Sequence, residues 1–98
     1  MSETSARRGG YVASKDDLRR RLQRIEGQVR GITRMVEDER YCVDVLQQIA
    51  AARAALDKVA LGLVDDHVRH CVLESDEGSR EEMTQELMGA LGRLVAGR

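Results

Sequence analysis

The sequence predicts an all-α fold in which the protomer has three helices. Strands favour aromatic and β-branched side chains, but this chain of 98 residues has no Trp, no Phe and two Tyr. Good helix formers such as Ala, Leu, Arg and Glu are abundant instead. Apolar residues also recur every three or four positions, which is the period of an amphipathic helix.

The first helix is expected over about residues 14–38, after a flexible N-terminal arm of residues 1–13. Ser14 followed by Asp17 is a typical helix start, a hydroxyl cap with an acid three residues later. The apolar stripe of this helix comprises Leu18, Leu22, Ile25, Val29, Ile32, Met35 and Val36. The basic residues off this stripe are Lys15, Arg19, Arg20, Arg21, Arg24, Arg30 and Arg34.

Two more helices are expected, over about residues 41–72 and 79–96, joined by a polar turn. One face of the second helix carries Leu46, Ile49, Leu56, Ala60 and Leu63. The stripe of the third helix comprises Met83, Leu87, Ala90, Leu91, Leu94 and Val95. A chain of this length forms one domain at most, so residues 14–98 are expected to form a single domain.

The net charge of −1 conceals an asymmetry. Residues 1–40 carry ten Lys and Arg against seven Asp and Glu, a net charge of +3, whereas residues 74–98 carry three against six, a net charge of −3. The basic charge at the front of the chain is compatible with an anionic partner such as nucleic acid.

The sequence indicates a cytoplasmic protein with no membrane partner. No stretch approaches 18 apolar residues, and the N-terminus lacks the apolar segment of a signal peptide. In a reducing compartment, two cysteines are more often metal-binding or redox-active than structural.

Three soft metal-ligand candidates, Cys42, His67 and Cys71, share one stripe of the second helix. His67 and Cys71 are four residues apart and therefore stack on one face. Cys42 returns to within about 20° of that stripe but lies roughly 37 Å away along a continuous helix. Two copies packed antiparallel would place Cys42 of one copy beside His67 and Cys71 of the other. The spacing thus predicts a dimer with two symmetric sites across its interface.

This donor set favours Cu(I). Two thiolates and an imidazole form a soft site, and Cu(I) accepts two or three soft ligands. Zinc prefers four ligands in structural sites, so a fourth ligand nearby would favour zinc. His70 is the obvious candidate, but it points about 100° away from Cys71 around the helix.

The chain resembles the copper-sensing repressors of the CsoR/RcnR family over about residues 14–96. The resemblance rests on Tyr41-Cys42, on His67-x-x-x-Cys71, on Arg34-Met35-Val36 and on the segment Arg24 to Gly31, which reads Arg-Ile-Glu-Gly-Gln-Val-Arg-Gly. Relatives that sense nickel or cobalt replace the last Cys by His, and relatives that sense persulfide lack the His. This chain keeps the three copper-type residues.

The resemblance implies an antiparallel helical dimer that pairs again into a dimer-of-dimers tetramer. It implies Cu(I) held by Cys42 of one protomer with His67 and Cys71 of the other. It also implies a second shell around the metal, which matches Tyr41 and Glu86 here.

As a member of this family, the protein would be a Cu(I)-responsive transcriptional repressor and not an enzyme, with no small-molecule substrate. The apo form would bind operator DNA, and Cu(I) would release it and derepress copper-resistance genes. The resemblance matches Arg21 and Lys58 to basic positions implicated in DNA binding. The basic face of the first helix adds Arg19, Arg20 and Arg24.

Two alternatives remain open on the sequence alone. A thiol or persulfide redox sensor could bridge Cys42 and Cys71 across the dimer, although such chemistry needs no imidazole at His67. A copper-buffering protein without DNA binding would leave the arginine-rich first helix unexplained. Arg53 is a further open point, because it falls on the ligand stripe near the centre of the predicted dimer; Asp57, of its own helix or of the partner, is its expected ion-pair partner.

Overall fold

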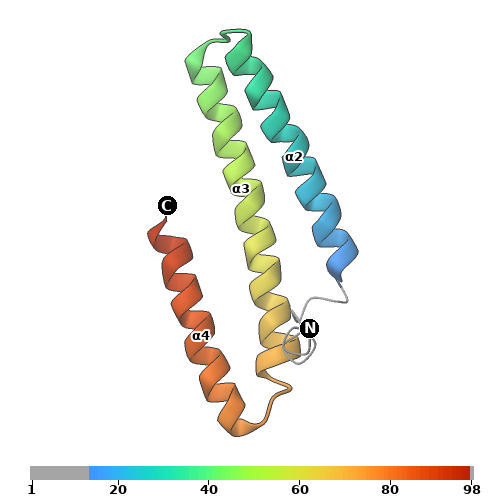
Figure 1. Cartoon of the computed structure of the whole chain (residues 1–98), viewed down its shortest axis with the longest axis vertical. Helices are drawn as coiled ribbons and strands as arrows, with labels where there is room; N and C mark the ends of the chain where they lie inside the picture. Colours follow the sequence, from blue (N-terminus) through green and yellow to red (C-terminus); the bar gives the residue numbers. More distant parts are fainter. Residues whose placement is uncertain (1–13, 98) are drawn as a thin grey trace. The chain divides into compact units, whose positions relative to one another are not determined.

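The computed structural model describes residues 14–97 and consists of helices joined by short turns (Figure 1). Helix α2 covers Lys15–Glu37, and α3 covers Cys42–His67. A single π-helical turn, η2, follows at Val68–Val72, and α4 covers Glu77–Ala96. The prediction of an all-α chain with three helices is confirmed.

The described residues form two compact units, one ending at Gly62 and the other beginning at Leu63. The boundary falls within the continuous helix α3. The predicted arm of residues 1–13 lies outside the described residues. No helix within residues 14–97 is long and apolar enough to cross a membrane.

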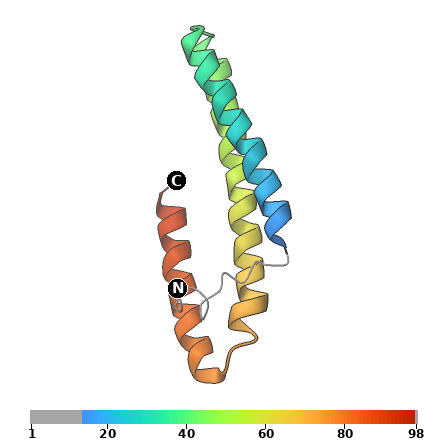
Figure 2. The same ribbon diagram turned by 45° about the vertical axis from the view of Figure 1, so that its right-hand side comes forward.

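The first unit is an antiparallel hairpin of α2 and α3, which lie side by side in both views (Figures 1 and 2). Its core contains Leu18 and Ile25 of α2 and Val59 of α3, with Ala55 packed against them. Each such apolar side chain contributes about 1.5–3 kcal/mol when fully buried. A Cβ atom added to Gly62 would lie 3.5 Å from Leu18 Cδ2, so glycine here leaves room for the Leu18 side chain.

The turn between α2 and α3 ends the first helix in a Schellman motif. The N–H of Arg40 donates to the carbonyl of Met35 at 2.9 Å, and the N–H of Glu39 donates to the carbonyl of Val36 at 3.1 Å. Glu39 has a φ of 54°, in the left-handed region that glycine usually occupies at this position. The hairpin therefore holds a non-glycine residue in a strained conformation two residues before Tyr41.

The helix expected over residues 41–72 is helical to its end, but its last turn is not α-helical. The α-helical part ends at His67, and the N–H of Leu73 donates to the carbonyl of Val68 at 2.9 Å. A bond that spans five residues makes the turn wider than an α-turn. Such single π turns occur mostly inside helices and often at functional sites.

Helix α4 begins at Glu77, two residues before the expected start near residue 79. Asp76 explains the early start, because its Oδ1 accepts the N–H of Ser79 at 2.8 Å. These hydrogen bonds from the Ser79 backbone and side chain, followed by the positive charge of Arg80, lower the pKa of Asp76 below its usual 3.8.

Candidate metal centre and basic face

Cys42 is the first residue of α3, and its side chain is exposed. The carbonyl of Tyr41 accepts the N–H groups of Asp44 and Val45 at 3.0 and 3.2 Å, so Tyr41 begins the helix. Its side chain is 67% exposed. One half of the predicted site is thus an accessible thiol on a well-anchored helix end, next to an accessible phenol.

His67 and Cys71 lie at the opposite end of α3, and both are half-buried. His67 is the last α-helical residue, and Cys71 lies in the π turn η2. In either an α-turn or a π turn, a residue four positions later lies within about 40° of the same direction. The π turn is therefore compatible with His67 and Cys71 lying on one face.

The three donors belong to different units of the chain, Cys42 to the first and His67 and Cys71 to the second. Cys42 is the first residue of helix α3 and His67 is its last. Among residues 14–97, no three His, Cys, Asp or Glu side chains form a group that could hold a metal ion. Neither cysteine, both of which are described, forms a disulfide.

Two other residues considered for the metal centre, His70 and Glu86, differ in what they offer a metal. His70 is exposed, and its Nδ1 lies 3.9 Å from Glu74 Oε2, an ion pair that exists only when the imidazole is protonated. Glu86, the predicted second-shell acid, is an exposed residue of α4. It lines a small pocket of about 190 Å³ with Ser79, Glu82 and Met83.

Arg80, in the first turns of α4, holds the backbone that follows Cys71. Its Nε donates to the carbonyl of Val72 at 3.3 Å, and its Nη2 donates to the carbonyls of Leu73 and Ser75 at 3.3 and 3.0 Å. The last carbonyls of a helix have no partner within it, and one guanidinium fork satisfies several of them here. The sequence pattern gave no role for Arg80, because its acceptors are backbone atoms of a turn that the apolar spacing does not reveal.

The arginines proposed for DNA binding lie on α2, and two of them already have acidic neighbours. Arg21 Nε lies 3.1 Å from Asp17 Oδ2, and Arg19 Nη2 lies 3.6 Å from Asp16 Oδ1. All four side chains are about half exposed or more. Exposed pairs of this kind contribute little to stability, so these guanidinium groups can exchange the carboxylate for a phosphate at small cost.

Arg20 and Arg24 are exposed and have no ion pair within residues 14–97. They are four residues apart and are separated from buried Leu18 by about 160° and about 120° around α2, which directs them away from the hairpin core. Lys58 is also exposed, on α3 of the same unit, about 160° from Cys42 around the helix. The hairpin thus carries positive charge on surfaces away from the ligand stripe.

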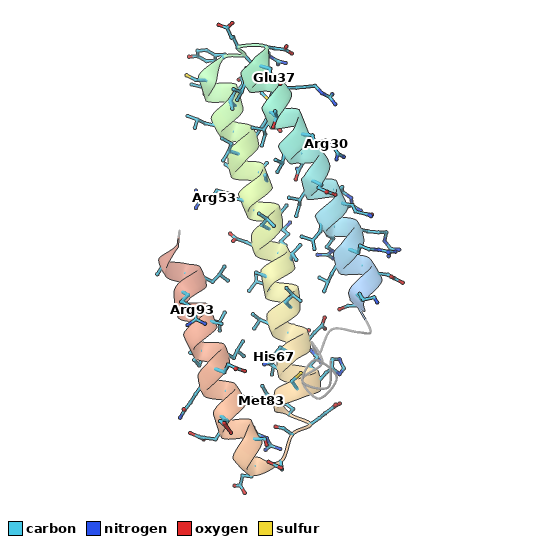
Figure 3. All side chains as sticks on the ribbon, in the orientation of Figure 1. Arg30, Glu37, Arg53, His67, Met83 and Arg93 are labelled. Atoms are coloured by element: carbon cyan, nitrogen blue, oxygen red, sulfur yellow. The ribbon has the colours of Figure 1, made fainter. Side chains whose placement is uncertain are left out.

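The face of α3 that begins at Cys42 and ends at His67, called here the ligand stripe, is not covered by other described residues along its middle. Its large apolar residues remain partly or mostly exposed: Leu46 at 62%, Ile49 at 38%, Leu56 at 46% and Leu63 at 37%. Arg53 lies on the same stripe and points away from α2 (Figure 3). Since Val59 belongs to the hairpin core and Ala55 packs against it, α3 has one covered face and one uncovered face.

Comparisons with known proteins identify the family. The family model of metal-sensitive transcriptional repressors matches residues 14–93. The chain is 48% identical to the copper-sensing transcriptional repressor RicR of Mycobacterium tuberculosis, over 88% of this chain and 93% of the relative. It is 53% identical to the copper-sensing transcriptional repressor CsoR of Bacillus subtilis, over 83% and 81% of the two chains.

A solved structure gives the same result for the fold. The chain matches the crystal structure of the copper-sensing repressor CsoR with Cu(I) from Geobacillus thermodenitrificans with a TM-score of 0.80 and 45% sequence identity. The match covers 86% of this chain and 88% of that one. The family consists of transcriptional repressors and not of enzymes, as expected from the resemblance. The chain belongs to the CsoR/RcnR family of metal-sensitive transcriptional repressors.

Proposed function

We propose that this repressor senses Cu(I) at two sites, each formed by Cys42 of one protomer with His67 and Cys71 of an antiparallel partner. The observation that carries this proposal is the unbroken helix α3, which has one thiol at its start and an imidazole and a thiol at its end. The names of the relatives, two of them copper-sensing repressors, support the choice of metal.

The uncovered faces of the hairpin support the assembly. On α2, Leu22, Val29 and Val36 are spaced seven apart and are 44%, 51% and 61% exposed. Together with the uncovered stripe of α3, they give the hairpin two apolar faces that its own core does not use. Burying such faces is the usual driving force for association. Two hairpins packed antiparallel would bury them in a four-helix arrangement, and two such dimers would form the tetramer.

The donor chemistry fits a monovalent copper ion. Two thiolates and one imidazole are soft ligands of the kind that Cu(I) accepts in a three-coordinate site. When bound, Cu(I) supplies a link between the ends of two α3 helices that belong to different protomers. The second nitrogen of the His67 imidazole donates its hydrogen to a neighbouring acceptor, for which Tyr41 and Glu86 are the proposed groups.

The basic side chains supply the contact with operator DNA. Arg20 and Arg24 offer exposed guanidinium groups, Arg19 and Arg21 can exchange their carboxylate neighbours for phosphates, and Lys58 adds a further positive charge. Neutralising phosphates releases counterions, so DNA affinity falls steeply as the salt concentration rises. A repressor that binds operator DNA would act in the cytoplasm.

Metal and DNA would then compete through the assembly. Closing the site fixes the ends of two α3 helices against each other, while the DNA contacts lie elsewhere on the same hairpins. If the metal-bound arrangement fits DNA less well, linkage requires that DNA weakens Cu(I) binding by the same factor by which Cu(I) weakens DNA binding. The genes behind the operator would be derepressed by copper.

Mixing two inactive variants tests the site directly. Cys42→Ala and Cys71→Ala each remove one half-site, so we expect each variant alone to lose tight Cu(I) binding. A mixed dimer would contain one intact site, because one protomer keeps Cys42 and the other keeps His67 and Cys71. After random exchange of subunits, about a quarter of the wild-type capacity returns. The measurement is an anaerobic titration with a Cu(I) chelator as competitor, and no recovery would contradict the shared site.

A second measurement separates the sensor from its alternatives. Cys42→Ala should bind operator DNA as the wild type does but should not be released by Cu(I), as followed by fluorescence anisotropy under anaerobic conditions. A copper buffer would not bind the DNA at all. A redox sensor would instead release DNA after treatment with peroxide or a persulfide donor, either of which accepts the two electrons that the two thiols lose, with a Cys42–Cys71 crosslink between chains in the mass spectrum.

A further inference from the structure

Val72, which directly follows Cys71, is held through both its side chain and its carbonyl. The side chain is buried, with 7% of its surface exposed. The carbonyl accepts a hydrogen bond from Ser75 Oγ at 2.7 Å, one from the N–H of Ser75 at 3.3 Å and one from Arg80 Nε at 3.3 Å. The backbone on the C-terminal side of Cys71 is therefore fixed at its first residue.

Arg80 extends this hold over the whole turn that precedes α4. Its Nη2 donates to the carbonyls of Leu73 and Ser75 at 3.3 and 3.0 Å, beside the bond from its Nε to Val72. Because the guanidinium is a planar and rigid fork, its donors fix the positions of these carbonyls relative to one another. The N–H of Arg80 also donates to the carbonyl of Asp76 at 2.8 Å. Arg80 thus joins the turn to the start of α4.

The contacts of Arg80 and the proposed donors His67 and Cys71 lie in the same unit, which begins at Leu63. A metal ion binds more tightly to donors that are already held in the binding arrangement, because less conformational freedom is lost on binding. Groups that orient metal ligands without touching the metal commonly change the metal affinity about tenfold to a hundredfold when they are removed. Arg80 acts on the backbone and not on a donor side chain, so we expect the lower end of this range.

We propose that Arg80 is a positioning residue of the metal centre, which raises the Cu(I) affinity of the His67 and Cys71 half-site by holding the backbone after Cys71. This inference rests on the proposed Cu(I) site and adds a residue of α4 to it. Linkage makes the effect reciprocal. If the hydrogen bonds of Arg80 strengthen Cu(I) binding about tenfold, bound Cu(I) stabilises the same hydrogen bonds by the same factor. The start of α4 would then respond to copper.

Arg80→Ala tests the affinity. We expect the dissociation constant for Cu(I) to rise about tenfold, with the number of sites unchanged because all three donors remain. A variant that merely folded less completely would instead lose sites. Arg80→Lys keeps the charge and has N–H donors, so it should recover part of the affinity, and Ser75→Ala should cause a smaller loss in the same direction. Anaerobic competition with a Cu(I) chelator gives the constants, and circular dichroism checks that each variant is folded.

Arg93→Ala is the matched control for charge, because it removes an arginine from the last turns of the same helix. Its dissociation constant for Cu(I) should equal that of the wild type. The sign of the effect gives a second control. Removing a positive charge near a cation site would by itself strengthen cation binding, so weaker binding in Arg80→Ala cannot arise from the lost charge.

The metal-free protein provides a readout that does not depend on copper. In the wild type, the NMR order parameters of the Cys71 and Val72 amides should lie near the value of about 0.85 that is typical of rigid backbone. In Arg80→Ala they should fall, whereas the order parameter of the Cys42 amide should not change. Equal order parameters in the two proteins would overturn the positioning role.

Hydrogen exchange tests the reciprocal effect. The N–H of Leu73 donates to the carbonyl of Val68, and the N–H of Ser75 donates to the carbonyl of Val72. Adding Cu(I) to the wild type should slow the exchange of both amides about tenfold. In Arg80→Ala, Cu(I) should slow them much less. Equal slowing in the two proteins would contradict the linkage.

Failure of the Arg80 role and failure of the proposed function give different results. If Arg80→Ala binds Cu(I) as tightly as the wild type, or Arg93→Ala binds it as weakly as Arg80→Ala, the role of Arg80 is wrong. The mixture of Cys42→Ala and Cys71→Ala would still recover Cu(I) binding in that case. If that mixture shows no recovery, the proposed shared site is wrong, and the role of Arg80 in it is overturned as well.

Discussion

The hairpin of α2 and α3 and the unit that begins at Leu63 are held together in different ways. The hairpin buries Leu18, Ile25, Ala52 and Val59, and its two long helices align these residues at intervals of seven. The second unit buries Val72 within the described residues, and α4 has no buried residue. Its identified contacts are polar, with the Arg80 fork and the Asp76 cap at their centre.

The packed core of the hairpin and the polar contacts of the second unit suit two different tasks. The hairpin has a core of its own and carries the proposed DNA contacts, so it can act as a rigid body. The second unit holds His67, Cys71 and Glu86 on a framework of hydrogen bonds that are partly exposed. Polar contacts of this kind open at a lower free-energy cost than a packed core. We therefore expect the proposed half-site that holds His67 and Cys71 to be more adjustable than the proposed half-site at Cys42.

Ile25→Ala should have the largest effect of the substitutions that test this contrast. Removing a buried isoleucine leaves a cavity and costs about 2–5 kcal/mol in the free energy of unfolding. Met88→Ala in α4 is the control, because Met88 is 61% exposed, and we expect a change within about 0.5 kcal/mol. Chemical denaturation followed by circular dichroism gives both values. Equal losses would contradict the contrast between the two units.

Arg80→Ala should loosen the second unit and leave the hairpin unchanged. It removes three hydrogen bonds to carbonyls after Cys71, and we expect a loss of about 1–2 kcal/mol, reduced from the full value because the guanidinium is largely exposed. Hydrogen exchange should become faster for the amides of residues 68–80 but not for those of residues 15–62. Arg93→Ala, on the same helix, is the control. Uniform acceleration across the chain would indicate a global effect instead.

Glu39→Gly should stabilise the hairpin. A non-glycine residue in the left-handed region costs about 1–2 kcal/mol, and glycine loses part of that gain through its greater freedom in the unfolded chain. The expected net gain is about 0.5–1 kcal/mol. Glu39→Ala removes the carboxylate but keeps the strain, so it should give no such gain. Thermal unfolding at equal protein concentration distinguishes the two variants.

Asp76 should make the start of α4 sensitive to acid, and this effect is the smallest. Its pKa in the folded chain lies below 3.8, so the cap stabilises the folded state above that value and this contribution is lost as the pH falls through the folded pKa. Asp76→Asn keeps a side-chain oxygen but cannot ionise, and its stability should not change across this range through this group. The measurement is helicity as a function of pH for the wild type and for Asp76→Asn. If the two curves run parallel, the Asp76 carboxylate does not cause the acid sensitivity.

The fold was predictable where one apolar period dominates, and less so at the helix ends. The apolar stripe of the first helix predicted α2. It did not reveal that Leu18 and Ile25 are buried against α3 while Leu22 and Val29 remain exposed. A periodic pattern does not identify which neighbour covers each residue. Ser14 precedes α2 as expected, yet its side chain makes no capping hydrogen bond. Competing hydrogen-bond partners decide such ends, and apolar spacing carries no information about them.

The candidate site was predictable only as three positions on one helix. The spacing of Cys42, His67 and Cys71 predicted that they share a stripe, because α3 is long and continuous. The π turn at residues 68–72 was not predictable, since Val-Arg-His-Cys-Val is compatible with either hydrogen-bond pattern and the two differ by one residue per turn. That the three donors form one site across two chains stays a prediction, which the mixing experiment tests.

The acceptors of Arg80 have a consequence for how the chain folds. All three lie five to eight residues before it, whereas the hairpin core must bring Leu18 near the start of α2 together with Val59 far along α3. Contacts between residues close in sequence have a small loop-closure cost and form early. We therefore expect the segment around Cys71 to acquire its local structure quickly and independently of the slower pairing of α2 with α3, so that its two donors are arranged before the hairpin is complete.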